Sequence, residues 1–225
     1  MIALIVTAIF APFLIGFKTP ALKSIPETST ENIVAQREFS LDDRYAVKSV
    51  NEVFKKNILL NLAYLNGTIT KKQDINWDKI ESAFHFTFRL KPGEVFAFHD
   101  SVLKEYEGKV VKTTNAHFGG PEGFVSDGYL FGDGVCHLAS LINWAAQDAH
   151  LGVLVTKNHN FAVIPEVPKT YGVSIYTDPS VKGSGAHNNL YVTNTKDHDV
   201  TFHFDYENDE LRVSVGESQK LALKN

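Results

Sequence analysis

The sequence predicts an α+β fold, in which N-terminal helices are followed by a mainly antiparallel β-sheet. Apolar residues recur at helical spacing from Val47 to Leu65 and again after His137. Between these two stretches, phenylalanines alternate with polar residues over Phe84–Leu90, which is typical of a half-buried strand. The last part of the chain consists of short apolar runs separated by polar turns, as in β-hairpins.

The individual elements follow from the same patterns. The helix over Val47–Leu65 should end at Asn66-Gly67, because glycine tolerates the left-handed conformation of a C-cap. A second short helix is expected over Ile75–Ala83. Strands are expected over residues 84–90, 95–98, 152–156, 161–164, 173–176, 190–193, 200–206 and 211–215.

The central stretch runs from Gly128 to Gly152 and contains the single cysteine, Cys136. After Cys136, one helical stripe is apolar and predicts a buried face; a second stripe carries Cys136, Ser140 and Asn143. A thiol at the start of a helix lies near unpaired backbone N–H groups, which favour the thiolate. The alternative is that Cys136 is a small buried apolar residue.

Composition limits the possible classes of protein. The chain has 225 residues and a net charge of −4, with 44% hydrophobic and 21% charged residues, as expected for a globular protein. It has no long basic run, which argues against a nucleic-acid partner. One cysteine excludes both an internal disulfide and a zinc site with several thiolates.

The N-terminus predicts export. Ile2–Phe17 is apolar and has the length of a signal-peptide core or a short membrane anchor, although a buried N-terminal helix is the alternative. We therefore expect an extracytoplasmic protein, secreted or attached to the membrane through this segment. The expected organisation is a hydrophobic segment (1–17), a polar linker (18–38), an α+β domain (39–194), and a C-terminal hairpin and tail (195–225) packed on that domain.

Three motifs carry a resemblance to a known family: the turn 91–98 (KPGEVFAF), the segment 127–129 (DGY) and above all the stretch 132–140 (GDGVCHLAS). With these motifs, residues 39–194 resemble the VanW-like family of bacterial envelope proteins, named after glycopeptide-resistance gene clusters. The family motif usually has glycine and glutamine where this chain has Asp133 and His137. A family histidine in the following strand region matches His159. The resemblance implies an envelope role, with a cell-wall polymer or another envelope component as partner.

The residues also permit thiol chemistry. A cysteine nucleophile needs a base, and the base needs an orienting group. Cys136 is the candidate nucleophile, His159 the base, and Asp178 or Asn158 the orienting group. Such a site would act as a hydrolase or transferase on amide or ester bonds of the peptidoglycan type, without a metal or cofactor. The backbone around Gly132 and Gly134 would stabilise the oxyanion, and the candidate substrate contacts are His137, Ser140, Tyr129 and Asn158.

Two other classes of site remain open. Cys136, His137, His159 and His117 could converge on zinc, although no helical ligand spacing supports this. A non-catalytic module could instead bind glycan or peptide in an aromatic groove. The groove candidates are Tyr129, Phe131, Trp144, Tyr171 and Tyr176. Accessibility of the Cys136 thiol separates catalysis from binding, because only catalysis requires it.

Overall fold

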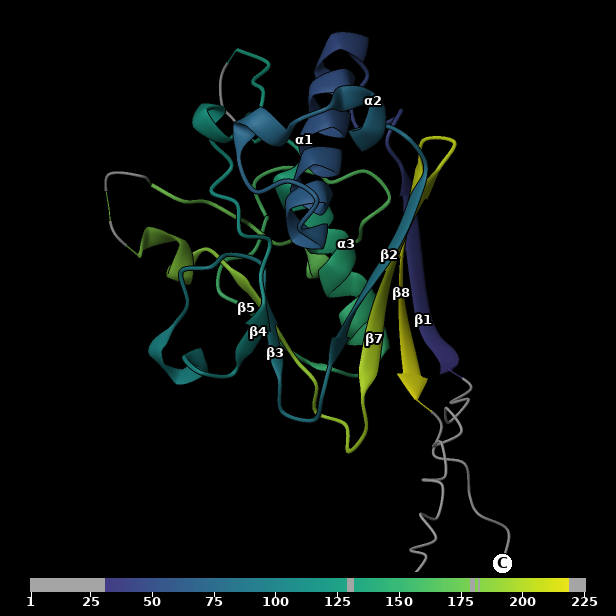
Figure 1. Cartoon of the computed structure of the whole chain (residues 1–225), viewed down its shortest axis with the longest axis vertical. Coiled ribbons are helices and arrows are strands. Elements are labelled where there is room, and N and C mark those ends of the chain that lie inside the picture. Colours follow the sequence, from purple (N-terminus) through teal and green to yellow (C-terminus); the bar gives the residue numbers. More distant parts are fainter. Residues whose placement is uncertain (1–30, 129–131, 179–180, 182, 219–225) are drawn as a thin grey trace, which may run out of the picture.

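The computed structural model describes residues 31–128, 132–178, 181 and 183–218. Two four-stranded sheets flank a central helix, α3, and a second long helix, α1, crosses one end of the molecule (Figure 1). This arrangement confirms the α+β class, with two sheets rather than one. The helices are α1 (Lys48–Asn66), α2 (Trp77–Ile80) and α3 (Val135–Asp148), and the strands are β1 (Glu31–Ser40), β2 (Phe84–Leu90), β3 (Val95–Ala97), β4 (Val110–Lys112), β5 (Gly152–Val155), β6 (Leu190–Thr193), β7 (Val200–Glu207) and β8 (Glu210–Ser218).

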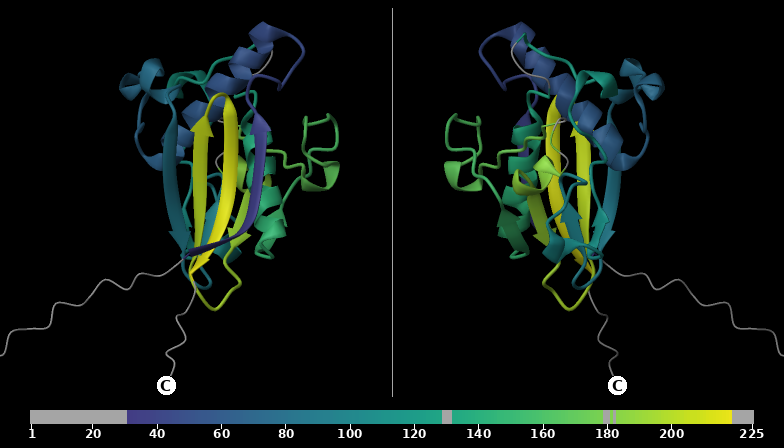
Figure 2. Two further views of the ribbon diagram at one scale, coloured as in Figure 1. Left: turned by 90° about the vertical axis from the view of Figure 1, so that its right-hand side faces the viewer. Right: turned by 90° about the vertical axis from the view of Figure 1, so that its left-hand side faces the viewer.

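The first sheet is antiparallel throughout, with the order β1-β8-β7-β2. Figure 2 shows it as a twisted layer with β1 at one edge and β2 at the other. The C-terminal hairpin of β7 and β8 occupies the centre of this sheet. The inward-facing side chains include Phe86, Phe202 and Phe204, and the rings of Phe86 and Phe204 stack at 4.8 Å.

Strand β1 corrects the expected domain boundary. Residues 31–38 were assigned to the polar linker, but they belong to β1, which pairs with β8 from Glu31 to Ser40. Ala35 and Phe39 are buried in the core. The sequence pattern does not predict this strand, because its inward positions include a small alanine and its flanking residues are mostly polar. A domain starting at residue 39 would lack an edge strand.

The second sheet has the order β4-β3-β6-β5, with one parallel pair, β3 and β4. The structure contradicts two expected strands. Residues 161–164 form bends and a loop, and of residues 173–176 only Val173 takes part in an isolated bridge, with Asn158. Phe161 and Val163 are 76% and 68% exposed. Of the apolar residues that predicted the strand over residues 161–164, Phe161 and Val163 therefore lie at the surface, while Ile164 is buried in the core.

Helices α1 and α3 agree with the sequence prediction. Gly67 ends α1 in the left-handed conformation with φ 83°, as expected for this C-cap. The apolar face of α3 is buried and contacts both sheets. The turn that starts α3 lies between α1 and the loop that contains Phe118. Within the described residues, no helix is long and apolar enough to cross a membrane; the apolar segment 2–17 lies outside them.

Candidate functional site

A glycine turn fixes the start of α3. Gly134 is its N-cap and has φ 99°, and a Cβ atom there would lie 2.8 Å from the carbonyl oxygen of Phe54 in α1. Gly132 has φ 80°, and its Cβ would lie 2.9 Å from the Cβ of Phe118. Glycine is therefore required at both positions for close packing as well as for conformation. The turn presses the start of α3 against α1 and places Cys136 in the first turn of the helix.

The sulfur of Cys136 bonds to the backbone of Ile175. The Ile175 N–H donates to Sγ at 3.3 Å, and the thiol donates to the Ile175 carbonyl oxygen at 3.6 Å. Burial raises the pKa of the thiol to about 11, and the charge of Asp133 adds to this effect, while the Ile175 N–H opposes it. The expected lowering of this pKa is therefore wrong, because lost hydration outweighs the effect of the helix N-terminus.

The remaining polar residues of the same stripe also bind backbone. Ser140 Oγ accepts the Val173 N–H at 2.9 Å and donates to the Cys136 carbonyl at 2.7 Å. Asn143 Nδ2 donates to the Tyr171 carbonyl at 2.8 Å. Together the stripe holds residues 171–175 against α3. Ser140 was expected to contact substrate, whereas here its hydroxyl has two partners within the protein.

The structure does not join Cys136 to the predicted base. His159 is buried, its Nδ1 lies 3.2 Å from the Ala162 carbonyl oxygen, and its ring packs on Phe161 at 4.0 Å. No hydrogen bond links its ring to the Cys136 sulfur, both residues being described. Asn158 forms a backbone bridge with Val173.

The other predicted site residues also lie apart from a thiol centre. His137 is buried against the ring of Phe54 at 5.0 Å. Burial first, then the charge of Arg44, lowers its pKa to about 3, so the ring is neutral. The backbone N–H of Asp178 binds Ser184 Oγ at 2.7 Å in the loop beyond the cleft. Tyr129 lies outside the described residues.

A cleft of about 490 Å³ is lined in part by residues 175–177. Its floor is apolar and its rim carries a histidine and a carboxylate. The lining residues are His117, Phe118, Gly119, Pro121, Glu122, Gly132, Val135, Ile175, Tyr176 and Thr177. Because Val135 and Ile175 flank the thiol, the cleft adjoins Cys136 without using its sulfur. We call it the His117 cleft.

A chain of imidazole and carboxylate groups forms the polar rim. His117 Nδ1 lies 2.9 Å from Glu122 Oε1, and its Nε2 lies 3.2 Å from Asp100 Oδ2. Asp100 also lies 3.0 Å from the buried ring of His99. Burial lowers the pKa of His117, but Glu122 and Asp100 raise it more, so the net shift is upward. The two carboxylates thus favour the cationic form of His117 at the mouth of the cleft.

Sequence reasoning named His117 only as a possible zinc ligand and did not identify Asp100 or Glu122. A usable signal was present, because His117 and Glu122 bracket a Gly-Gly-Pro turn that can fold one onto the other. Asp100 lies on a distant loop and could be placed only by the fold. No group of three or more His, Cys, Asp or Glu side chains within the described ranges is arranged to hold a metal ion.

The glycine turn contains a further titrating group. Burial raises the pKa of Asp133 to about 6, and the negative charge of Asp127 contributes to the rise. The Asp133 backbone carbonyl accepts a hydrogen bond from Asn57 of α1 at 3.0 Å. The turn is therefore anchored by its backbone, while the Asp133 side chain is destabilised when charged.

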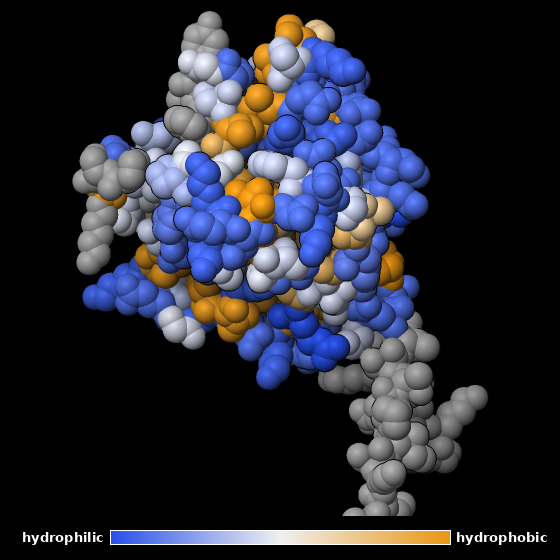
Figure 3. Space-filling view, turned by 45° about the horizontal axis from the view of Figure 1, so that its top comes forward, coloured by the Kyte–Doolittle hydropathy of each residue, from blue (hydrophilic) through white to orange (hydrophobic). Residues whose placement is uncertain are grey.

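The candidate aromatic groove is divided by the fold. Trp144 and Tyr171 stack on each other at 5.4 Å beside α3, and Arg37 lies over the Trp144 ring. Tyr176 instead lines the His117 cleft and is 56% exposed. Figure 3 shows a band of apolar residues, bordered by hydrophilic ones, across the upper face of the molecule. An exposed aromatic residue beside a charged rim is typical of a ligand-binding surface.

These features define an α+β domain with an open cleft beside the glycine turn that starts α3. The model of the family described as VanW like protein matches residues 82–216, more than half of the chain. The chain therefore belongs to the VanW-like family, and the matched region includes the entire His117 cleft, β7 and all but the last two residues of β8. Comparison with curated proteins and with solved structures gave no match.

Proposed function

We propose that this protein is an extracytoplasmic envelope module that binds a cell-wall polymer in the His117 cleft without catalysing a reaction. Its location rests on the apolar segment Ile2–Phe17 and on the envelope role that membership of the VanW-like family implies. Binding rather than catalysis is supported by one observation above all. The Cys136 sulfur is bonded to the Ile175 backbone, and its pKa is raised to about 11, whereas the adjoining cleft is open.

The chemistry of the cleft suits a glycan carrying short peptides. Tyr176 and Pro121 offer apolar surface for the face of a sugar ring, since an aromatic ring combines apolar contact with a polar tip. The imidazole of His117 and the carboxylate of Glu122 can bond to hydroxyl or amide groups at the rim. Because the thiol is not required, the ligand would leave the cleft unchanged.

The test is binding of the full-length protein to purified insoluble cell walls and to their soluble fragments. We expect Tyr176→Ala to weaken binding about tenfold, as loss of an aromatic anchor does. Tyr45→Ala is the matched control, since Tyr45 is 50% exposed and lies outside the cleft. Cys136→Ala should bind like the wild type. Absence of binding, or an equal loss in Tyr45→Ala, would overturn the proposal.

Thiol-dependent hydrolysis or transfer on peptidoglycan-type amide or ester bonds is the second candidate. It is favoured by the position of Cys136 in the first turn of α3, where backbone N–H groups lack helical partners. Alkylation of the native protein against pH separates the two functions. A binding module should react slowly at neutral pH, and its rate should rise only as pH approaches about 11. An inflection well below about 8.5 would favour the enzyme.

A further inference from the structure

Strand β2 forms an uninterrupted edge of the first sheet. Among the described strands it has one neighbour, β7, and the two pair in register from Phe84 to Leu90. Its even-numbered side chains face the core, whereas His85, Thr87 and Arg89 are exposed. Alternate residues of an edge strand direct their N–H and C=O groups outward, where they can pair with another chain.

The opposite edge of this sheet is protected. β1 has a bulge between Ile33 and Ala35, which interrupts regular pairing. Its Arg37 forms an ion pair with Asp148 of α3 and lies over the Trp144 ring at 4.6 Å. β2 has neither a bulge nor such a contact with α3. Of the two edges, β2 is therefore the one that remains regular and available (Figure 2).

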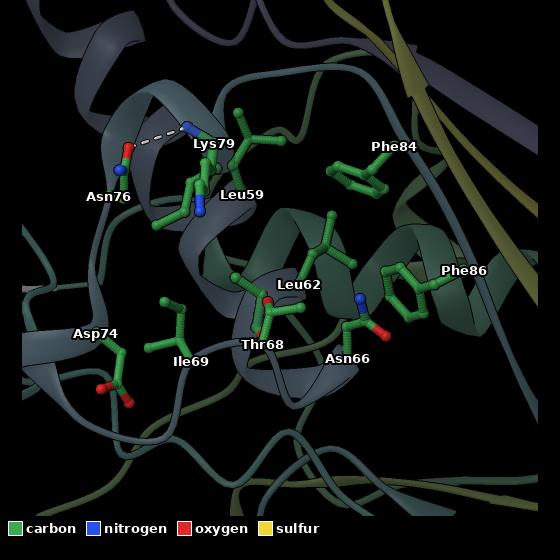
Figure 4. Close-up of a pocket in the computed structure, with 12 residues that line it drawn as sticks. Leu59, Leu62, Asn66, Thr68, Ile69, Asp74, Asn76, Lys79, Phe84 and Phe86 are labelled. Atoms are coloured by element: carbon green, nitrogen blue, oxygen red, sulfur yellow. Dashed lines mark hydrogen bonds between the residues drawn. The ribbon is translucent and has the colours of Figure 1, made fainter.

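An apolar pocket adjoins the upper half of this edge. It has a volume of about 370 Å³ and lies between the C-terminal half of α1, α2 and β2. Figure 4 shows the rings of Phe84 and Phe86 and the side chain of Leu62 pointing into one space. The volume is near the lower end of the range for ligand pockets, roughly 300–1,000 Å³, and suits one large apolar side chain.

The rim of this pocket offers polar groups that the protein leaves unused. Lys79 forms no ion pair, and the Asn66 side chain no hydrogen bond, with any residue that the structure describes. The carboxylate of Asp74, by contrast, accepts hydrogen bonds from the Thr70 hydroxyl at 2.9 Å and from the Thr70 and Lys71 N–H groups, each at 3.2 Å. Asp74 keeps its negative charge but is held by groups of its own loop, whereas the ammonium group of Lys79 has no ion-pair partner among the described residues. An acidic group on the part of the ligand that lies beside Lys79 would therefore be favoured.

We propose that β2 and this pocket bind an extended peptide segment of another protein, which adds a strand to the sheet. Main-chain hydrogen bonds to β2 would supply affinity, and an apolar side chain in the pocket would supply specificity. An acidic residue near that side chain would pair with Lys79. This site shares no residue with the His117 cleft and is independent of cell-wall binding.

Pairing with a second copy of this chain is less favourable. Two antiparallel β2 strands centred on Thr87 would place Arg89 of each opposite His85 of the other. His85 and Arg89 already contact Asp205 and Asp199 of their own chain, so this pairing would add no ion pair between the strands. β2 also contains no acidic residue that could pair with Lys79 of the other copy. The favoured occupant is therefore a different chain, with an acidic rather than a basic residue at the rim.

The experiment uses a synthetic strand-forming peptide of about eight residues, with alternating valine and threonine, a central leucine and a nearby aspartate. Hydrogen exchange of the full-length protein should show slower exchange in β2 when the peptide is added. Two derivatives test the geometry, one N-methylated at odd and one at even positions. Because a strand on one edge uses alternate N–H groups, one derivative should bind normally and the other at least about tenfold more weakly.

The charge at the rim provides an independent readout. Lys79→Glu should weaken binding of the aspartate peptide about threefold to tenfold, and replacing the aspartate by lysine in the peptide should restore it. Lys48→Glu, at an exposed position at the start of α1, is the matched control and should bind normally. Equal binding of both N-methylated peptides, absence of exchange protection at millimolar peptide, or β2 protection through self-association without peptide would each overturn the proposal.

Discussion

Two polar regions adjoin the segment around Ile175, and each contains side chains of types that can take part in catalysis or binding. On the inner side, Cys136, Ser140 and Asn143 use their polar atoms to bind the backbone of residues 171–175. On the outer side, His117 and Glu122 bond to each other at the rim of an open cleft. Ser140 and Asn143 are fully buried and Cys136 is partly buried, whereas the side chain of His117 is exposed and can meet a ligand.

The difference teaches that residue type does not decide between structure and chemistry at this site. A nucleophile needs a base and access to substrate. The Cys136 thiol instead bonds to both the N–H and the carbonyl group of Ile175, and burial raises its pKa. A buried polar group that satisfies backbone contributes to folding, since removing it leaves an unpaired partner. The predictions below test this division into an inner structural region and an outer binding region.

The largest effect is expected where the inner region meets α1. Gly134→Ala would force a residue with a side chain into a positive φ and place its Cβ 2.8 Å from the Phe54 carbonyl oxygen. We therefore expect the free energy of unfolding to fall by about 3 kcal/mol or more. Gly128→Ala is the matched control, because its φ is also positive but a Cβ there meets nothing within 4 Å. Its expected cost is about 1–2 kcal/mol. Chemical denaturation measures both variants, and equal losses of unfolding free energy in Gly134→Ala and Gly128→Ala would contradict the close packing of the turn.

Removal of the inner hydrogen bonds should come next. Ser140→Ala leaves the Val173 N–H without its acceptor, and Asn143→Ala leaves the Tyr171 carbonyl without its donor. Each should lower the free energy of unfolding by about 1–3 kcal/mol. Gln147→Ala is the control, since Gln147 is exposed and only donates to Asn143. If the two buried variants are as stable as the control, the inner region does not have a structural role.

Asp133 should make the stability of the folded protein measurably dependent on pH. Its pKa is raised from 3.8 to about 6, so its stabilising contribution is full below 3.8 and is lost as pH rises through about 6. Asp133→Asn should remove this dependence and, allowing for screening by water, stabilise the protein at neutral pH by about 1 kcal/mol. Denaturation curves across this pH range provide the measurement, and a variant with an unchanged pH profile would show that the carboxylate is not destabilised.

The smallest effect on stability is expected at the outer rim. The pKa of His117 is raised above its ordinary value of 6.5, so its contribution is full below 6.5 and is lost as pH rises through the folded-state pKa. Because the ring is half exposed, His117→Gln should cost less than about 1 kcal/mol at pH 6 and nothing at high pH. The same variant should weaken cell-wall binding. A large loss of stability with unchanged binding would place His117 in the structural region.

Much of the fold could be predicted because local periodicity matches burial. The apolar spacing of α1 and the alternation in β2 follow directly from which side chains face the core. The same reasoning failed for β1, whose inward positions include Ala35, and for Phe161 and Val163, which are apolar yet exposed. Pairing with β8 makes residues 31–40 a strand despite their weak local pattern. Residues 161–164 form a loop despite their apolar pattern.

The sequence by itself determined the α+β class, the start of α3 at a glycine turn, and the stripe that carries Cys136, Ser140 and Asn143. These are local properties, set by backbone freedom and helical spacing. Only the tertiary structure decided the roles of those residues. Residues 171–175 pack against the stripe and take its hydrogen bonds, while Asp100 and Glu122 converge on His117 from different loops. Burial and long-range partners set a group's pKa and access, and both depend on segments distant in the chain.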